Sequence, residues 1–430
     1  MEYGLDGHTL VSRLIQEVMI MNIEKINQIF ADTAYVRTST SPEELKCAEY
    51  IKEQCAQMGL EAHLESFEIE RSTIKKAVLL ADGKEIPCAG YMCSGSAEIE
   101  APFYYLSNRD AYSLKNCSGK IVMIDAAGMP RWTYQDLLDN GAVGYITYCG
   151  DALYADEDIA RKELRPYVHN GIKIPGININ AKSAIELVRN ETKTVKIILE
   201  QDEYMGTSHN VVLDLPGEIE DTIVLSAHYD STSLSVGTYD NMSGCVGLLG
   251  IAEKFAKEPH RYSLRFIWCG SEEIGLMGSR AYTKAHLSEL EHFVLNVNLD
   301  MIGSIMGKFI ACCSADEKLV HFIEYLGAIE GFGIAAKQDV YASDSTPFAD
   351  AGVPSLSFAR LAPHNTATIH TRYDTIDVMK AEQMLKDIAF INTFVDKMAN
   401  AKLCPVSRQI PDAVKEKLDV YLARKRGNNQ

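Results

Sequence analysis

The sequence contains no Cys-x-x-Cys pair, although eleven cysteines are spread over its 430 residues. An odd number of cysteines without regular spacing argues against a disulfide framework, and a reduced cysteine in an apolar run behaves as a small hydrophobic side chain. No apolar run approaches a membrane-spanning length. The first residues also lack the basic and apolar regions of a signal peptide. Together these absences predict a cytoplasmic protein with reduced thiols.

The sequence also lacks an excess of positive charge, because it has 42 Lys and Arg but 59 Asp and Glu, which gives a net charge of −17. This sign argues against nucleic-acid backbones and anionic membranes as partners, and it favours solubility and the attraction of cations. A hydrophobic share of 47% with 23% charged residues is ordinary for a soluble globular protein. The length allows two domains, or one domain that carries a large insertion. The oligomeric state stays open.

The first 200 residues change character part of the way along. Apolar residues at helical spacing predict a helix over residues 9–30, and Ser41-Pro-Glu-Glu44 predicts a capped helix from there to about residue 58. Residues 60–70 alternate as a strand does. Beyond about residue 72, short β-like runs are separated by Gly, Pro and Cys, at residues 75–80, 120–124, 144–148 and 195–199, with one helix near 133–140.

From residue 205 onward the pattern becomes regular. Strands are predicted at residues 223–227, 262–269, 293–299, 308–313 and 353–358, and helices at residues 243–257, 278–286, 316–327 and 381–398. A short fraying helix is expected within residues 415–430. Strands separated by helices imply a mostly parallel mixed sheet flanked by helices on both faces. The predicted fold class is therefore α/β.

Polar side chains follow three of these apolar strands at the point where each one ends. Ser226-Ala-His-Tyr-Asp-Ser231 places His228 and Asp230 at the end of the first strand, and Asp240 follows before the next helix. Open α/β sheets place their active sites at this edge. A His-x-Asp motif taken alone is more often a satisfied surface pair than a metal site. Its meaning depends on what the other strand ends supply.

The later strand ends supply further carboxylates. The strand at 262–269 runs into Glu272 and Glu273, where like charges held together raise each other's pKa. Asp300 ends the strand at 293–299, and burying it there is costly unless it is paired or bound to a metal. His370 lies in a loop before the last helix, where a single His is more often structural than a ligand.

Taken together, these residues predict a metal centre. Two imidazoles and three carboxylates suit two zinc-like divalent ions that are bridged by one of the carboxylates. The candidate ligands are His228, Asp240, Glu273, Asp300 and His370. In such sites the ions share a hydroxide nucleophile and polarise a carbonyl. Glu272 would remain as the general base, and Asp230 would accept the other imidazole N–H of His228 and fix its tautomer. Cobalt or manganese would also suit these ligands.

This ordered set closely resembles the bizinc aminopeptidases, the zinc exopeptidase family that includes bacterial leucyl aminopeptidases and glutamate carboxypeptidases. The family's motifs match this sequence in order over roughly residues 205–400, through His228/Asp230, Asp240-Asn-Met-Ser-Gly244, Glu272-Glu273, Asp300 and His370. The resemblance implies that Asp240 bridges the two metals. It further implies that His228 and Asp300 complete one metal position, that Glu273 and His370 complete the other, and that Glu272 is the base.

The segment between the two halves of this fold resembles a protease-associated (PA) domain. The resemblance rests on Ser118-Gly-Lys-Ile-Val-Met-Ile-Asp125 and Asn140-Gly-Ala-Val-Gly-Tyr-Ile146, although the Arg-Gly that often follows the first strand is absent. The predicted domains are therefore residues 1–70 with 205–430, and an inserted 71–204. A second departure from the family is Ser345, which stands where many relatives have His. Tyr341, nearby, is as consistent with packing as with an oxyanion role.

The leading functional hypothesis is a two-zinc aminopeptidase that removes N-terminal residues from peptides, with a bridging hydroxide activated by Glu272. A carboxypeptidase, a dipeptidase or another amide hydrolase on the same fold is the second reading. It would need a cationic pocket, for which Arg360 and Arg372 are the candidates. The third is a non-catalytic binding protein with the same fold. Such relatives usually lose ligands or the base, whereas this chain keeps all of these positions.

Overall fold

The computed structural model describes residues 21–150 and 158–427 of the chain. It divides into two compact units, Met1–Phe67 with Ser208–Leu418 and Glu68–Thr207 with Asp419–Gln430. Two long strands, β1 (His63–Ala81) and β8 (Thr194–Leu215), contribute residues to both units. Among the described residues, no helix combines the length and the apolar character needed to span a membrane.

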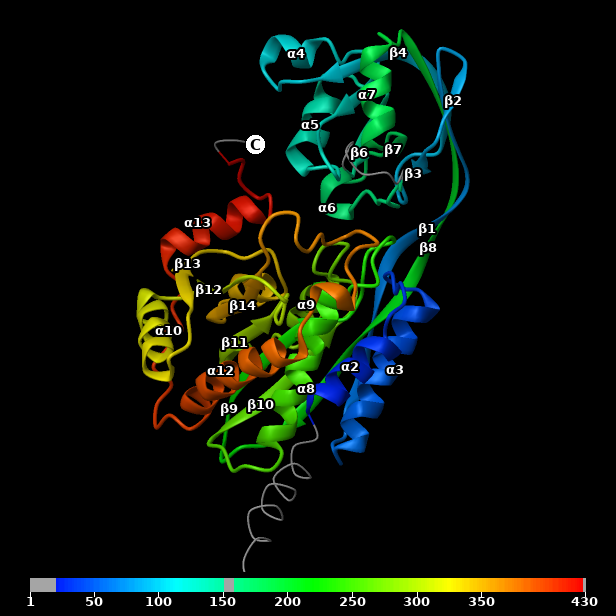
Figure 1. Ribbon diagram of the computed structural model, residues 1–430. Coiled ribbons are helices and arrows are strands. Elements are labelled where there is room, and N and C mark those ends of the chain that lie inside the picture. Colours follow the sequence, from blue (N-terminus) through cyan, green and yellow to red (C-terminus); the bar gives the residue numbers. More distant parts are fainter. Residues whose placement is uncertain (1–20, 151–157, 428–430) are drawn as a thin grey trace, which may run out of the picture. The chain divides into compact units, whose positions relative to one another are not determined.

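The first unit is built on a mixed, mostly parallel sheet in the order β13-β12-β14-β11-β9-β10-β8 (Figure 1). Its strands are β9 (Ile219–His228), β10 (Tyr262–Cys269), β11 (Phe293–Leu299), β12 (Lys308–Ser314), β13 (Ala335–Gln338) and β14 (Ser355–Leu361). Strand β9 runs parallel to both β10 and β11, and β11 runs parallel to β14. The carboxyl ends of these central strands therefore meet at one edge, and the predicted fold class is confirmed.

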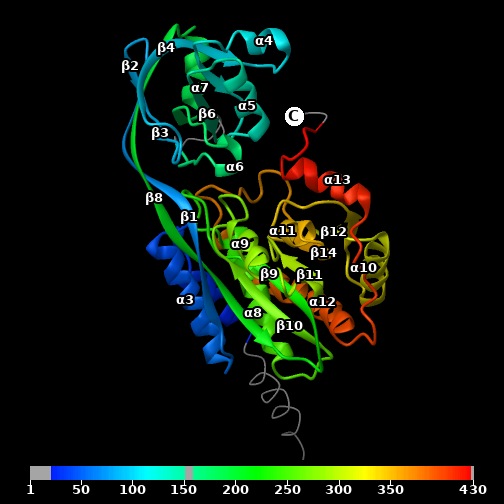
Figure 2. The same cartoon turned by 180° about the vertical axis from the view of Figure 1, so that it is seen from behind.

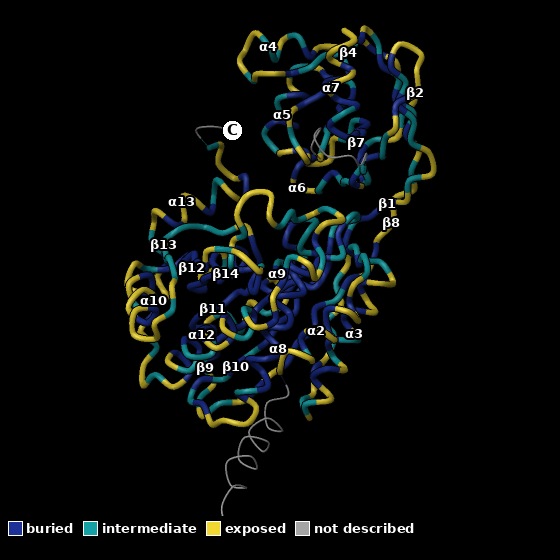
Figure 3. The backbone as a smooth tube through the Cα atoms, in the orientation of Figure 1, coloured by how far each residue is buried: buried dark blue, intermediate teal, exposed yellow. Residues whose placement is uncertain are grey.

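Helices cover both faces of this sheet (Figures 1 and 2). The helices of the unit are α2 (Ile23–Asp32), α3 (Pro42–Gln57), α8 (Ser243–Phe255), α9 (Met277–Ala285), α10 (Glu317–Glu330), α11 (Ser345–Asp350), α12 (Ala381–Ala399) and α13 (Asp412–Tyr421). Alternate residues of β9 enter different cores: Ile223 and Leu225 pack in the large cluster with α8 and α12, whereas Val224 packs with α9 and α11. In Figure 3 the central strands are mostly dark blue, the colour of buried residues, whereas the yellow of exposed residues appears on outer helices such as α10. A strand buried on both faces explains the nearly continuous apolar runs in the sequence.

The second unit has its own core. Strands β4 (Ala97–Leu106), β5 (Ile121–Ile124), β6 (Gly144–Cys149) and β7 (Gly176–Asn180) run parallel in that order. The short strands β2 (Lys84–Ile86) and β3 (Ala89–Gly90) pair with β1 and β7. Helices α4 (Ala111–Lys115), α5 (Arg131–Asp139), α6 (Pro166–His169) and α7 (Ala181–Arg189) complete the unit. Helix α7 is an element that the sequence patterns did not predict.

Local signals predicted the helix starts better than the strand lengths. In α3, Ser41 Oγ accepts a bond from the Glu44 amide as the predicted N-cap, whereas Glu44 Oε2 accepts one from the amide of Thr40 instead of that of Ser41, so the capping box forms only in part. The expected strands at 60–70 and 75–80 are instead one strand, β1, because the residues between them include no Gly or Pro to interrupt it. Similarly, the run at 195–199 continues into the strand before Pro216 as β8.

At the chain ends the outcome is mixed. Of the helix expected over residues 9–30, the described part is α2, which runs from Ile23 to Asp32, and residues 9–20 lie outside the described residues. The helix expected near the C-terminus begins earlier than predicted, as α13 at Asp412.

Two elements of the first unit, strand β13 and helix α11, were not predicted.

Candidate metal centre

The residues singled out in the sequence come from neighbouring strand ends. His228 is the last residue of β9, Asp300 directly follows β11, and Glu272 and Glu273 lie three and four residues beyond the end of β10. Asp240 lies in the segment between β9 and α8. His370 comes from the loop between β14 and α12. Five segments far apart in the sequence therefore place these side chains at one edge of the sheet.

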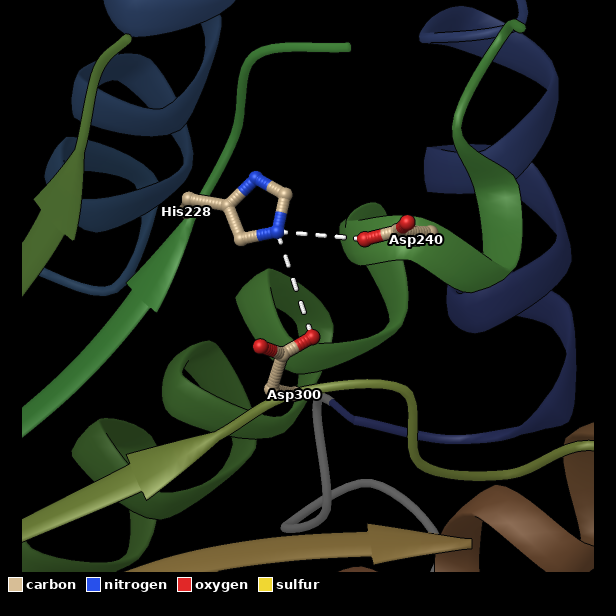
Figure 4. Close-up of side chains that lie close together, drawn as sticks. All are labelled: His228, Asp240 and Asp300. Carbon is tan, nitrogen blue, oxygen red and sulfur yellow. Dashed lines mark ion pairs between the residues drawn. The ribbon is translucent and has the colours of Figure 1, made fainter. Parts of the chain in front are cut away.

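His228, Asp240 and Asp300 form the first possible ligand group (Figure 4). His228 Nε2 lies 3.2 Å from Asp240 Oδ1 and 3.9 Å from Asp300 Oδ1. One atom from each of the three residues lies within 4.8 Å of the other two. All three residues are buried, so this group faces the interior of the unit.

The second group consists of Asp240, Glu273 and His370. His370 Nε2 lies 3.1 Å from Asp240 Oδ2 and 3.0 Å from Glu273 Oε2. Asp240 thus turns one oxygen toward each imidazole and belongs to both groups. The His370 side chain is 44% exposed, which makes this group the more accessible of the two.

Burial and mutual repulsion perturb the acids of this site. Burial raises the pKa of Asp300 to about 8, although His228 acts to lower it. Burial likewise raises the pKa of Glu272 well above its usual range, against the effect of His228, with Glu273 adding to the rise. For Asp240 burial acts in the same direction, but the contacts with His228 and His370 outweigh it and hold its pKa below the usual range. Burial thus disfavours the charged forms of Asp300 and Glu272, whereas the two imidazoles favour the charged form of Asp240.

The imidazoles respond to the same charges. Burial acts to lower the pKa of His228, but the nearby carboxylates of Glu272, Asp230 and Asp240 raise it well above its usual value. The pKa of His370 is raised for a similar reason, since Glu273 and Asp240 outweigh its burial. Within residues 21–150 and 158–427, no Lys or Arg forms an ion pair with Asp240 or Asp300. The carboxylates are paired with these two imidazoles, and a His, Asp and Glu donor set of this kind fits divalent ions such as zinc.

Asp230 contacts both the first histidine and the paired glutamates. Its Oδ1 lies 3.4 Å from His228 Nδ1. Its two oxygens also accept bonds from the amides of Glu272, at 2.9 Å, and Glu273, at 3.2 Å. The shorter contacts are those to the amides. Asp230 therefore fixes the backbone that carries the glutamates. His228 Nδ1 has no hydrogen-bond partner among the described residues, so the predicted hydrogen bond from this ring to Asp230 is not formed.

Asn241 links two of the strand ends. Its Oδ1 accepts bonds from the amides of Gly244 and Met301, and its Nδ2 donates to the carbonyl of Leu299. These contacts hold both neighbours of Asp300. Three non-glycine residues in the left-handed region lie at this site: Ser271 (φ 56°) and Met301 (φ 64°), which are next to candidate residues, and the candidate ligand His370 (φ 60°). Such backbone costs about 1 kcal/mol or more per residue, so its clustering is typical of a functional site.

A buried hydroxyl network supports the backbone next to Glu272. Glu44 Oε1 accepts bonds from Ser208 and Ser271, each at 2.9 Å, and Ser271 Oγ also lies 2.6 Å from Ser39 Oγ. The sequence indicated only the capping role of Glu44. Its exposure is only 1%, and its partners come from β8 and from the segment after β10, which the capping motif does not reveal.

The burial of Glu44 predicts a pH effect on stability. Burial, reinforced by Asp230 and opposed by the bonds from Ser208 and Ser271, raises the pKa of Glu44 from 4.5 to about 8. The folded state therefore holds this proton more tightly than the unfolded state, so the stabilisation present below pH 4.5 is lost as the pH rises through 8. The unfolding free energy should fall by roughly 2–4 kcal/mol over this range on account of this group.

Glu44→Gln, which keeps the shape of the neutral acid, should remove that part of the pH dependence. Urea unfolding at about pH 5 and about pH 8 measures the difference. Glu43→Gln is the matched control, because Glu43 is the exposed neighbour on the same helix. An equal pH dependence in wild type and Glu44→Gln would contradict the prediction.

Arg360, one of the two arginines considered for a substrate carboxylate, has other partners. Its guanidinium pairs with the fully buried Asp387 at 2.6 Å and lies over the ring of Phe309. The side chain therefore packs in the core, and the carboxypeptidase hypothesis loses one of its two candidate arginines.

Burial and the nearby Asp300 raise the pKa of Tyr341 above its usual range, so its phenol stays protonated. Ser345 is buried among the hydroxyls of Ser343 and Ser357.

Two further residues of the site escaped the sequence patterns. Asp374 lies four residues after His370 and is buried, with its oxygens accepting bonds from the amides of Tyr239 and Asp240. Arg37, from the segment before α3, is buried against the loop that follows β9. For Asp374 the proximity to His370 is a weak signal. For Arg37 the sequence offers none, because arginine is rarely buried completely.

Comparison with known proteins finds similar peptidases. Residues 210–392 match the model of peptidase family M28. The chain is 30% identical over 228 residues to aminopeptidase YwaD of Bacillus subtilis, which covers 50% of this chain and 49% of that protein. It is 23% identical over 309 residues to the probable lipoprotein aminopeptidase LpqL of Mycobacterium tuberculosis, covering 69% of this chain and 60% of that protein. The chain thus spans about half to three fifths of the length of these relatives.

Solved structures show the same fold. The structure of BSAP, a zinc aminopeptidase from Bacillus subtilis, superposes with a TM-score of 0.75 at 22% identity, covering 91% of this chain and 98% of that one. An aminopeptidase from Aneurinibacillus sp. strain AM-1 gives a TM-score of 0.73 at 21% identity, covering 91% of this chain and 97% of that one. The family match and these structures confirm the resemblance to zinc exopeptidases drawn from the motifs.

Proposed function

We propose, from the premise that this chain belongs to peptidase family M28 through residues 210–392, that it is a zinc-dependent aminopeptidase. The observation that carries the proposal is the pair of ligand groups that share Asp240. The names of its relatives support the same reaction, since YwaD and BSAP are both called aminopeptidases. Peptides with a free N-terminus would be the substrates.

In this proposal His228, Asp240 and Asp300 hold one zinc ion, and Asp240, Glu273 and His370 hold the other. When bound, zinc would polarise the scissile carbonyl and lower the pKa of the attacking water. Cobalt or manganese would suit the same donors. The exposed His370 supports substrate entry on the side of the second group.

Glu272 is the proposed general base. Its Oε2 lies 3.9 Å from His228 Nε2, so the carboxylate is beside the first ligand group without being a member of either group. It would take a proton from the attacking water and deliver that proton to the leaving amine as the peptide bond breaks. Asp230 would hold the amides of Glu272 and Glu273, a positioning role. Tyr341 is a further candidate donor to the developing oxyanion.

The acidic centre also supports amino-terminal rather than carboxy-terminal hydrolysis. A substrate α-ammonium is attracted to carboxylates, whereas a substrate carboxylate needs a cation. Arg360 is already paired with Asp387.

The assignment of residues 71–204 as a PA-like insertion and the cytoplasmic location remain predictions.

A comparison of two substrate types tests the proposed function. Aminoacyl p-nitroanilides with a free amine should be hydrolysed, and N-blocked dipeptides should not. Chelation should abolish the activity and added zinc should restore it. Turnover confined to the N-blocked dipeptides would establish the carboxypeptidase alternative. A purified protein that takes up no zinc would instead favour a non-catalytic binding protein.

A further inference from the structure

Arg37 is a fully buried cation whose donors all go to backbone carbonyls. Its side chain is 0% exposed, and it forms no ion pair among the described residues. The guanidinium donates to the carbonyls of Tyr229, Val236 and Gly237 in the loop after β9, and to those of Thr33 and Tyr35 in its own segment. Burial of a charge is costly unless its hydrogen bonds are satisfied. Here one loop supplies three of the five acceptors.

That loop joins two of the candidate metal ligands. It begins directly after His228 and leads to Asp240. The main chain of Arg37 also pairs with it, because the Arg37 amide donates to Ser231 Oγ and the Ser231 amide donates to the Arg37 carbonyl. Gly237 has a φ of 56°, and a Cβ there would lie 2.5 Å from the carbonyl oxygen of Asp240 and 3.0 Å from Arg37 Nη2. The loop is therefore packed closely against the guanidinium.

Asp374 holds the other end of the same loop. Its Oδ1 accepts a bond of 2.7 Å from the Tyr239 amide, and its Oδ2 accepts one of 3.1 Å from the Asp240 amide. The Asp374 side chain is 1% exposed. A buried cation thus binds the loop by its carbonyls and a buried anion binds it by its amides. Hydrogen bonds that involve a charged group are roughly twice as strong as neutral ones.

We propose that Arg37 and Asp374 are positioning residues that hold the segment from His228 to Asp240 in its metal-binding conformation before any metal is bound. This inference rests on the proposed function, because it concerns two of the proposed zinc ligands. Ordering a free loop costs about 1–2 kcal/mol per residue in backbone entropy. A loop that is already fixed avoids this cost when the ion binds, which strengthens binding. Arg37 lies outside the segment that matches the family model.

The first test measures zinc affinity in the metal-free, full-length protein with a competing chromophoric chelator. Arg37→Lys keeps the positive charge but replaces the planar set of five donors with a single ammonium. It should weaken zinc binding by about 10–100-fold, the range found when partners of metal ligands are altered. Arg360→Lys is the matched control. It alters another arginine of low exposure in the same unit, whose side chain pairs with Asp387. Within the described residues, Arg360 meets the loop only through its main-chain carbonyl, which accepts a bond from Tyr239 Oη and is kept in the variant, so zinc affinity should stay unchanged.

The second test needs no metal. Hydrogen exchange of the metal-free protein, followed by mass spectrometry of peptides that cover residues 229–242, reports directly on the loop. Exchange should be faster in Arg37→Lys and in Asp374→Asn, because an asparagine can accept only one of the two amide bonds. Asp374→Asn also tests the inference in a protein that retains Arg37. Arg360→Lys should exchange as wild type does.

The two proposals fail in different ways. Unchanged zinc affinity and unchanged loop exchange in Arg37→Lys and Asp374→Asn would overturn the positioning role while leaving the aminopeptidase proposal intact. A wild-type protein that binds no zinc would overturn the proposed function. In that case faster loop exchange in both variants would still support the part of the inference that concerns the loop conformation.

Discussion

Glu272→Gln should lower kcat by about 10²–10⁴-fold, because a positioned general base contributes a factor of that size. Glutamine matches glutamate in shape but cannot take the proton from water. Glu272 belongs to neither ligand group, so the variant should retain its zinc. KM should change little, since the proton transfer takes place in the chemical step. Steady-state hydrolysis of an aminoacyl p-nitroanilide, together with metal analysis of the same sample, measures both quantities.

The neighbouring glutamate provides the matched comparison. Glu273 is a member of the second ligand group and lies 3.0 Å from His370 Nε2. Glu273→Gln should therefore lose activity together with zinc, and added zinc should restore part of that activity. Glu272→Gln should stay inactive at any zinc concentration. Near-normal kcat in Glu272→Gln would falsify its role as the base, whereas parallel loss of zinc from both variants would make Glu272 a ligand.

Asp240→Ala should empty both metal positions at once. Asp240 directs Oδ1 toward His228 and Oδ2 toward His370, so it is the single residue that both groups share. Without it each group retains two donors, and zinc sites in proteins generally need at least three protein ligands. Zinc content should fall close to zero, and aminopeptidase activity should disappear with it.

Asp300→Ala is the control for this prediction, because Asp300 belongs to the first group only. That variant should lose zinc from one position and retain it in the other. Zinc per chain, measured after dialysis against a defined free-zinc buffer, distinguishes the two outcomes. If Asp240→Ala kept as much zinc as Asp300→Ala, the shared-ligand arrangement would be wrong. Circular dichroism of both variants checks that the fold persists.

The candidate ligands could be predicted from the sequence because a parallel sheet aligns its strand ends. His228, Asp300 and the Glu272-Glu273 pair each follow an apolar run that fixes the direction and the end of its strand. Once βα alternation indicates parallel strands, those ends must lie at one edge. The N-cap at Ser41 is similarly local, and the start of α3 was predicted with it. Local hydrogen bonding and periodicity were sufficient for these features.

Strand lengths and supporting contacts depended on residues distant in the sequence. Strands β1 and β8 continue through polar stretches because pairing with their neighbours outweighs weak local signals. Asp230 illustrates the same limit: its position two residues after His228 suggested a partner for that ring, yet its shortest bonds go to amides 42 and 43 residues away. No spacing rule in the sequence indicates those bonds.

The sequence by itself thus determined the α/β class and the candidate side chains that the structure brings together at one edge of the sheet. Only the tertiary structure decided how those side chains are held. Arg37, Glu44 and Asp374 look like ordinary polar residues in the sequence, and each becomes a supporting group because folding buries it beside a ligand-bearing loop. The physical reason is that Arg37 and Asp374 bond to backbone groups, which every residue possesses and which the sequence therefore cannot distinguish. Glu44 bonds to the hydroxyls of two serines that are distant in the sequence.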